Sequence, residues 1–176
     1  YDMIVSLSAN LRYTIKGGEL VSLQAELDYV DRYILLQKTR LGGRLEVTKK
    51  INPKVNLAVI PKISIQMLVE NAIIHGMPED GAVLHIIIRV CMENNRLLIS
   101  VYDDGKGILP EKVKELNDIF SGKSADTGNS IGLPNLASRL KILYQGEAGL
   151  FLESQGDQFT EVKMELPIRK RGNENV

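Results

Sequence analysis

An acidic, glycine-containing segment, Asp103-Asp104-Gly105-Lys106-Gly107, follows a strand-like stretch of the sequence and precedes a proline. Glycine permits positive φ, and it lets main-chain atoms approach a flat ligand that a Cβ would keep away. A carboxylate at a strand end can accept a hydrogen bond from an exocyclic amine, the group that distinguishes adenine among the common bases. The alternative is a glycine turn with a solvated acidic pair, and this segment alone leaves both open.

A second segment, Glu70-Asn71-Ala72-Ile73-Ile74-His75-Gly76, ends the first helix that we expect in the core. Asn71 falls off the apolar stripe of that helix, and a neutral amide oxygen suits a Mg²⁺ ion that takes its remaining ligands from water and phosphates. His75 could stack on a base or ribose, although a lone histidine near a helix end more often caps carbonyl groups. Glu70 could position water, a base or the metal, or it could be an exposed helix charge, and its role stays open.

The third segment, Ser130-Ile131-Gly132-Leu133-Pro134-Asn135, runs from a polar loop into a helix that contains Arg139. Free N–H groups at a helix N-terminus, with a glycine that allows close approach, form an anion site suited to phosphates. A plain loop-to-helix junction capped by Ser130 is the alternative. The three segments together favour a nucleotide site more strongly than any one of them.

A helical arm is expected at residues 1–43, interrupted at Gly17-Gly18 and closed by Gly42-Gly43. From Leu23 to Leu41 the apolar residues recur at the spacing of a helix that packs on another helix. Ser22 is a suitable N-cap for this stretch. The apolar stripe fits either a helix packed on its own domain or a dimer seam, and the pattern does not separate the two.

A new domain is predicted over residues 44–168, where the hydrophobic period first changes to two. We expect a strand from Leu45, a helix opened by Pro61, a hairpin turning at Asn94-Asn95, a short helix opened by Pro110, a further helix and two final strands. Residues 121–130 are expected to be a mobile loop and residues 169–176 a disordered tail. Strands in hairpins with helices gathered on one face predict an α+β two-layer sandwich.

The composition argues against several classes of protein. Lysine plus arginine and aspartate plus glutamate number 22 each, so no global field attracts nucleic acid. The lone Cys91 cannot form an internal disulfide, and we expect it to be a small core side chain in a reducing compartment. The longest apolar run, Val83 to Val90, is too short to span a bilayer. Because the chain begins with Tyr1, we expect it to be part of a longer protein.

The order and spacing of the three segments resemble the N, G1 and G2 boxes of the GHKL superfamily of ATPases and kinases, which share the Bergerat nucleotide-binding fold. Further stretches resemble the LytS/YesM-type sensor histidine kinases over nearly the whole chain. These stretches are Leu11-Arg12-Tyr13, Val21-Ser22-Leu23, Glu26-Leu27, Tyr33, Gln37, Arg40, Arg44-Leu45, Ile60-Pro61, Gln66, Leu68-Val69-Glu70-Asn71-Ala72, His75-Gly76, Gly132-Leu133, Asn135 and Arg139-Leu140.

The resemblance implies a mixed sheet with helices on one face, and an ATP pocket that uses magnesium. Asn71 would be the metal ligand, with Glu70 beside it as a catalytic residue, and Asp103 would recognise adenine. Residues 109–130 would form the ATP lid. The other nucleotide-binding residues implied are His75, Gly105, Gly107, Ile108, Gly132, Leu133 and Asn135.

The chain departs from the family pattern in three places. Ser130 stands where the G2 box usually has its first glycine, and Gly156 to Thr160 lacks the adjacent glycine-threonine common near the last strands. The phosphoacceptor histidine of the family lies in an asparagine-proline-histidine-phenylalanine run. The only histidines here are His75 and His85, outside such a context, so the chain is not expected to phosphorylate itself.

The family resemblance implies transfer of the ATP γ-phosphoryl group to an upstream histidine and then to a response regulator. It further implies a homodimer through the helical arm, and a cytoplasmic domain of a membrane-anchored protein. Superfamily members that hydrolyse ATP carry a carboxylate one helical turn before the metal asparagine, where this chain has Met67. A thioether cannot act as a base, so a self-contained ATPase is disfavoured.

Two other functions fit part of the sequence. A degenerate module without kinase activity is supported by Ser130 and the missing glycine-threonine, and opposed by the intact Asn71, Asp103, Gly105 and Gly107. A serine kinase is discouraged by the helical arm.

Overall fold

The computed structural model of the chain describes residues 19–55, 57–125 and 132–168. The predictions for the first part of the arm with its Gly17-Gly18 break, for Ser130 and Ile131, and for the tail at 169–176 lie outside the described residues. The expected loop at 121–130 falls within them only as far as residue 125.

The central hairpin is confirmed. Strands β4 (Leu84–Glu93) and β5 (Arg96–Asp103) pair antiparallel, and the turn between them places Asn94 and Asn95 at φ 48° and 61°. Two positive φ values in a two-residue loop are the geometry that matches the twist of the flanking strands, and asparagine tolerates it better than most residues.

Five strands form one mixed sheet in the order β2-β4-β5-β7-β6. Strand β2 (Leu45–Ile51) runs parallel to β4, whereas β6 (Gly149–Gln155) and β7 (Phe159–Pro167) continue the sheet antiparallel. In β7 the predicted alternation is confirmed, because Thr160, Val162, Met164 and Leu166 are buried and the residues between them are not.

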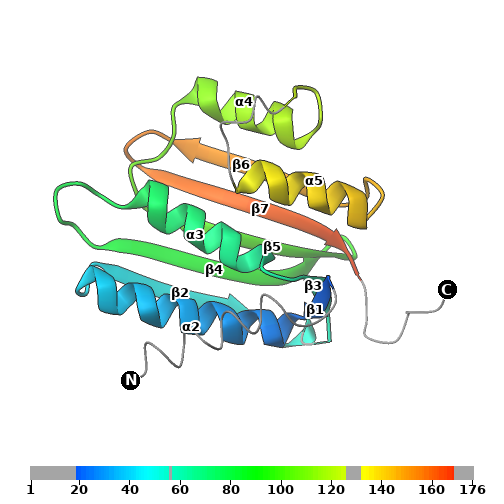
Figure 1. The fold of residues 1–176 in the computed structure, drawn as a ribbon, viewed down its shortest axis with the longest axis horizontal. Coiled ribbons are helices and arrows are strands. Elements are labelled where there is room, and N and C mark those ends of the chain that lie inside the picture. Colours follow the sequence, from blue (N-terminus) through cyan, green and yellow to red (C-terminus); the bar gives the residue numbers. More distant parts are fainter. Residues whose placement is uncertain (1–18, 56, 126–131, 169–176) are drawn as a thin grey trace.

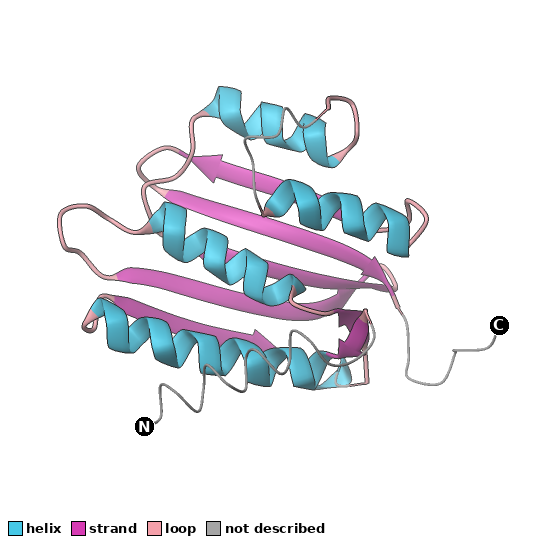
Figure 2. Ribbon diagram, in the orientation of Figure 1, coloured by secondary structure: helices cyan, strands magenta, loops and turns pink. Residues whose placement is uncertain are grey.

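Three helices lie side by side on one face of this sheet, as Figure 1 shows, and Figure 2 shows the same two layers by element type. They are α2 (Leu23–Leu41), α3 (Ser64–Gly76) and α5 (Leu133–Leu143). A fourth helix, α4 (Pro110–Phe120), lies at the β6 edge. The α+β two-layer sandwich with a mixed sheet is therefore confirmed. The predicted stripe of α3 is buried against the sheet: Ile65, Leu68, Val69, Ala72 and Ile73.

Helix α2 begins and ends where the sequence indicates. The Ser22 hydroxyl accepts a hydrogen bond from the N–H of Ala25, and Gly42 closes the helix at φ 59°. The inner residues of α2, among them Leu27 and Val30, belong to the same hydrophobic core as α3 and the sheet. In the described structure the apolar stripe thus packs on its own domain.

The prediction that Pro61 opens a helix is wrong. Pro61 ends the short strand β3 (Val59–Pro61), which pairs antiparallel with β1 (Leu20–Ser22), and the 3₁₀ turn η1 (Pro53–Val55) precedes it. A proline is tolerated at a strand end because its missing N–H breaks no ladder there. Helix α3 starts three residues later, after Ile63 at φ 67°.

Cys91 is also not the core side chain expected from its apolar neighbours. It is half-buried, with the adjacent Val90 fully buried. Successive side chains of a strand point to opposite faces of the sheet, and Cys91 falls on the face without helices.

Candidate functional site

A cavity of about 410 Å³ opens where the end of α3, the β5–α4 loop, α4 and the start of α5 meet. Five of the predicted site residues line it: Asn71, His75, Gly107, Ile108 and Leu133. Two further lining residues, Lys106 and Pro134, stand in the segments singled out from the sequence but were given no role there. The other lining residues are Lys112, Leu116 and Leu152. Residues more than sixty positions apart in the chain thus share one site.

The lining of this cavity suits a flat apolar group attached to an anion. Ile108, Leu116 and Leu133 supply apolar walls, Lys106 and Lys112 supply two cations, and no carboxylate is among the described residues that line it. The Nζ atom of Lys106 lies 3.1 Å from Glu79 and that of Lys112 lies 2.8 Å from Glu115. Both ion pairs are exposed and hence weak, so a bound anion can replace them.

Asn71 is half-buried on α3, one helical turn before His75. Among the residues that the structure describes, no hydrogen bond engages the Asn71 side chain. Its amide oxygen is a hard neutral donor of the kind that Mg²⁺ accepts beside phosphate and water. The described residues contain no cluster of three or more His, Cys, Asp or Glu side chains that could hold a metal by itself. The donor set therefore fits an ion that arrives with phosphates.

Asp103, at the end of β5, is only 2% exposed. Its Oδ1 atom accepts a hydrogen bond from the N–H of Gly105 at 3.1 Å. Burial raises the pKa of Asp103 to about 7, against the lowering effect of that hydrogen bond. A Cβ built on Gly76 would lie 2.5 Å from Oδ1, so the carboxyl group lies against the end of α3, directly after His75.

Gly105 and Gly107 are required by contacts within the protein. A Cβ on Gly105 would come within 2.1 Å of the Gly76 carbonyl oxygen, and one on Gly107 within 2.1 Å of the Gln155 carbonyl oxygen. Gly107 also has φ 62°. The sequence predicts glycine here for positive φ, which Gly107 confirms, and for close approach by a ligand. In the structure the two glycines first allow the β5–α4 loop to touch α3 and the β6–β7 turn.

Asp104, next in sequence, has a different environment. Its carboxylate accepts the His85 backbone N–H at 2.7 Å and lies 2.7 Å from His85 Nδ1 on the exposed side of the sheet. The two neighbouring aspartates therefore differ in burial and in their hydrogen-bond partners, and of the two it is Asp103 that lies against α3.

Five predicted site residues are not among the residues that line the cavity: Asp103, Gly105, Glu70, Gly132 and Asn135. Glu70 accepts a long 3.4 Å hydrogen bond from Gln66. The pKa of Tyr33 on α2 is raised to about 12, first by burial and second by the charge of Glu70. Gly132 precedes α5 with φ 124° and ψ −105°, a conformation restricted to glycine, and Asn135 is exposed on α5. Their roles stay predictions.

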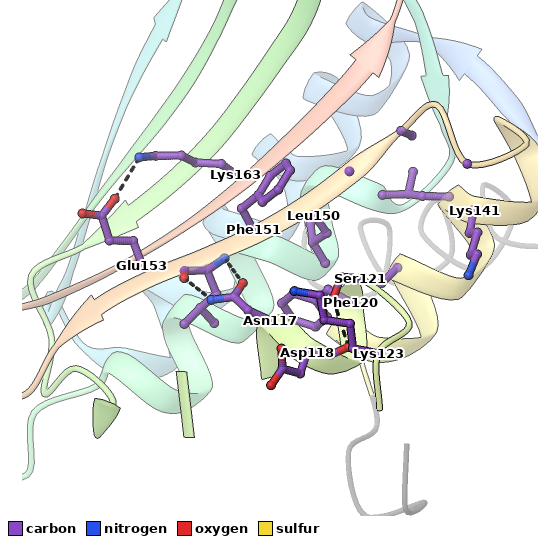
Figure 3. Close-up of a pocket in the computed structure, with 16 residues that line it drawn as sticks. Asn117, Asp118, Phe120, Ser121, Lys123, Lys141, Leu150, Phe151, Glu153 and Lys163 are labelled. Atoms are coloured by element: carbon purple, nitrogen blue, oxygen red, sulfur yellow. Dashed lines mark hydrogen bonds and ion pairs between the residues drawn. The ribbon is translucent and has the colours of Figure 1, made fainter. Parts of the chain in front are cut away.

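A larger cavity of about 590 Å³ lies between α4, α5 and β6, and no predicted site residue lines it (Figure 3). At its edge the Asn117 side chain donates to the Leu152 carbonyl oxygen at 2.7 Å and accepts from the Leu152 N–H at 2.9 Å. Figure 3 shows both bonds as dashed lines. The side-chain amide of Asn117 thus forms with β6 the pair of backbone hydrogen bonds that a further strand would form there.

Comparison with known proteins identifies the family to which the chain belongs. Residues 61–170 match the family of histidine kinase-, DNA gyrase B- and HSP90-like ATPases, and residues 1–45 match the histidine kinase family. The first match covers more than half of the chain, so the protein belongs to this ATPase family, and the GHKL resemblance is confirmed.

Individual relatives are sensor kinases. The chain is 29% identical to the sensor protein LytS of Bacillus anthracis over 98% of its own length and 29% of that protein. It is 38% identical to the sensor histidine kinase YpdA of Escherichia coli K12 over 81% of its length and 25% of that protein. The chain therefore spans less than a third of the length of each of these two relatives.

Among solved structures, the catalytic domain of the histidine kinase ThkA superposes with a TM-score of 0.60 at 16% identity. The match covers 84% of this chain and 93% of that one. At this identity the match establishes the fold alone. Within the residues that the structure describes, no helix is both long and apolar enough to cross a bilayer.

Proposed function

We propose that the chain binds ATP with magnesium in the smaller cavity and presents the γ-phosphoryl group to a histidine of a longer sensor kinase. The observation that carries this proposal is the convergence of Asn71, Lys106 and Lys112 on one cavity whose described lining residues include no acid, near the buried carboxyl group of Asp103. An acid-free cationic cavity selects an anion, and the apolar walls add a place for a base.

Each part of the nucleotide has a candidate partner. Among the lining residues, Asn71 is assigned to the metal, and Lys106 and Lys112 to the phosphates. Asp103, which lies beside Gly76 at the end of α3, is assigned to the adenine amine. The amides at the start of α5 after Gly132 add a second phosphate contact. Bound magnesium would supply charge neutralisation at the phosphate oxygens. His75, Gly105, Ile108, Leu133 and Asn135 complete the proposed nucleotide site, with Glu70 beside the metal ligand.

Transfer to a protein histidine is favoured over hydrolysis because no carboxylate stands at residue 67. Met67 instead packs against the hydrophobic core. Without a group that deprotonates water, the site positions a phosphoryl donor and leaves the nucleophile to another part of the protein. We extend the proposal to a response regulator as the next acceptor, to a homodimer formed through the arm at 1–43, and to a cytoplasmic place in a membrane-anchored protein.

The proposal is tested by calorimetric titration of the chain with a non-hydrolysable ATP analogue, with and without Mg²⁺. We expect magnesium-dependent binding, loss of at least about tenfold in affinity for Asp103→Asn, and an unchanged affinity for Asp104→Asn. Asp104 is the matched control because its carboxylate binds His85. Equally poor binding by wild type and Asp103→Asn would show a degenerate pocket.

The transferase step is tested in a longer chain that includes the upstream histidine. Incubation with labelled ATP is expected to give an acid-labile phosphate characteristic of phosphohistidine, and Asn71→Ala is expected to abolish the label. An acid-stable label would instead indicate phosphorylation of serine.

A further inference from the structure

Glu26 on α2 is a fully buried carboxylate, with an exposed fraction of 0%. It accepts hydrogen bonds from three backbone N–H groups at the start of α3: Ile63 at 2.8 Å, Ile65 at 3.0 Å and Gln66 at 3.4 Å. Figure 1 shows that α2 and α3 run side by side and begin at the same end of the sheet. A glutamate almost forty residues upstream therefore satisfies the free amides of another helix.

Helix α3 has no cap of its own. The N-cap position is held by Ile63, whose side chain makes no capping hydrogen bond and whose φ is 67°. A β-branched residue in this region is strained, and such strain persists only where the surroundings impose it. The Glu26 carboxylate binds the N–H of that strained residue, and its negative charge also complements the positive end of the helix dipole.

A second contact holds the same segment from the other side. Arg139 of α5 donates a hydrogen bond to the carbonyl oxygen of Lys62, the residue before Ile63. The start of α3 is thus fixed between α2 and α5. Helices α3 and α5 carry Asn71 and Leu133, two residues that line the cavity.

We infer that Glu26 is a positioning residue that sets the axial position of α3 and, through it, the placement of Asn71. This inference rests on the proposed function of Asn71. Gln66 and Asn71 are five residues apart on one helix, and a helix transmits a displacement at its first turn along its axis. Glu26 lies in the region matched by the histidine kinase family, and α3 in the region matched by the ATPase family. Its hydrogen bonds therefore join the arm to the nucleotide site.

The most informative variant is the one that weakens the Glu26 cap without changing the size of the side chain. Glu26→Gln keeps the volume of the side chain but removes the charge, and its NH₂ group would face backbone donors. One of the buried amides would then lose its acceptor. Asp28→Asn is the matched control, because it neutralises an exposed acid on the same helix.

The experiment measures two quantities for wild type, Glu26→Gln, Glu26→Asp and Asp28→Asn. The first is the NMR signal of the Asn71 side-chain amide in nucleotide-free protein. The second is the ratio of ATP-analogue affinities with and without Mg²⁺. For Glu26→Gln we expect a shifted Asn71 signal and about a tenfold loss of the magnesium-dependent gain in affinity, with the affinity for the ATP analogue without Mg²⁺ unchanged. We expect Asp28→Asn to match wild type, and Glu26→Asp to fall between wild type and Glu26→Gln.

Ile63→Gly separates positioning from folding, since glycine relieves the strain at φ 67°. In the double variant Glu26→Gln/Ile63→Gly we expect the thermal midpoint of unfolding to return toward that of wild type. The ratio of ATP-analogue affinities with and without Mg²⁺ should stay as low as in Glu26→Gln. Recovery of both, or an Asn71 signal and ratio equal to wild type in Glu26→Gln, would overturn the inference. If wild type shows no magnesium-dependent binding, the proposed function fails, and only the link from Glu26 to metal binding fails with it. The Asn71 signal in nucleotide-free protein still tests whether Glu26 places α3: an unchanged signal in Glu26→Gln overturns that part, and a shifted signal supports it.

Discussion

Gly105 and Gly107 show how a motif attributed to a ligand can also be required by the protein itself. Both lie where a side chain would collide with backbone of another element, at 2.1 Å in each case. The sequence predicts that glycine is needed at these positions. The partner that requires it, the end of α3 or the β6–β7 turn, depends on contacts between residues distant in the chain.

We expect Gly105→Ala to lower the free energy of unfolding by about 1–3 kcal/mol or more, because the new methyl group meets the rigid carbonyl of Gly76. Gly156→Ala is the matched control. It lies in a nearby turn at an ordinary φ, with no atom within 4 Å of the place that its new methyl group would occupy, so its effect should stay within about 0.5 kcal/mol. Urea denaturation of the two variants measures the difference, and equal stabilities would contradict the contact.

The buried carboxyl group of Asp103 makes stability depend on pH. Its pKa is raised to about 7, from an ordinary value of 3.8, chiefly by burial. The folded state therefore binds this proton more tightly than the unfolded state. The stabilisation that results is fully present below about pH 4 and is lost as pH rises through 7.

We expect the stability of wild type relative to Asp103→Asn to fall by up to roughly 4 kcal/mol between pH 4 and pH 7, and to level off above. Denaturation of both proteins across this range provides the measurement. Parallel pH profiles would show that Asp103 ionises as it does in the unfolded chain.

At the residue scale the sequence predicts Asn71, His75 and Gly107 as members of one site, because each stands in a segment of distinctive type. It gives no role to Lys106, although Lys106 stands in the same segment as Gly107, and it does not single out Lys112. The charge of a lysine is indistinguishable from ordinary surface charge until the fold turns it toward a cavity.

At the scale of elements, α4 is held by partly buried apolar side chains and by polar contacts with β6. None of its side chains is fully buried, and Asn117 forms two hydrogen bonds to the backbone of Leu152 in β6. Its residues Lys112 and Leu116 line the smaller cavity. The Asn117 amide therefore contributes to the position of α4 over the site.

Asn117→Ala is expected to lower the local stability of α4 by about 1–2 kcal/mol and so to speed amide hydrogen exchange there by roughly 5- to 30-fold, leaving the sheet unchanged. Lys114→Ala, an exposed substitution on the same helix, is the control and should leave exchange unaltered. Unchanged exchange in Asn117→Ala would mean that other contacts hold the helix.

The start of α3 explains why one element boundary was predicted wrongly. Local sequence places Pro61 at a suitable helix opening, yet the helix begins after Ile63. Its cap is Glu26, from a different helix, and no local pattern indicates a partner that distant. The stripe of α3 was predicted correctly because burial on a sheet imposes its own period.

At the scale of the whole molecule, α2 contributes to the core that supports the site. Leu23, Leu27 and Val30 are at most 6% exposed and belong to the same core as α3. Burial of a large aliphatic side chain is worth about 1.5–3 kcal/mol, and a domain is stable by only about 5–15 kcal/mol.

We therefore expect a chain that begins at residue 44 to lose cooperative thermal unfolding, although it retains every proposed nucleotide-binding residue. Circular dichroism of the full and shortened chains compares the two. A shortened chain with the thermal midpoint of the full one would show that residues 44–168 are stable without α2.

The most direct test of the proposed site is an NMR titration of the full chain with a non-hydrolysable ATP analogue and Mg²⁺. We predict that the signals of Asn71, Gly105 and Gly107 shift together, while those of Gly146 and Phe151 in the larger cavity do not. Shifts confined to the larger cavity, or the absence of shifts around Asn71, would contradict the proposed site.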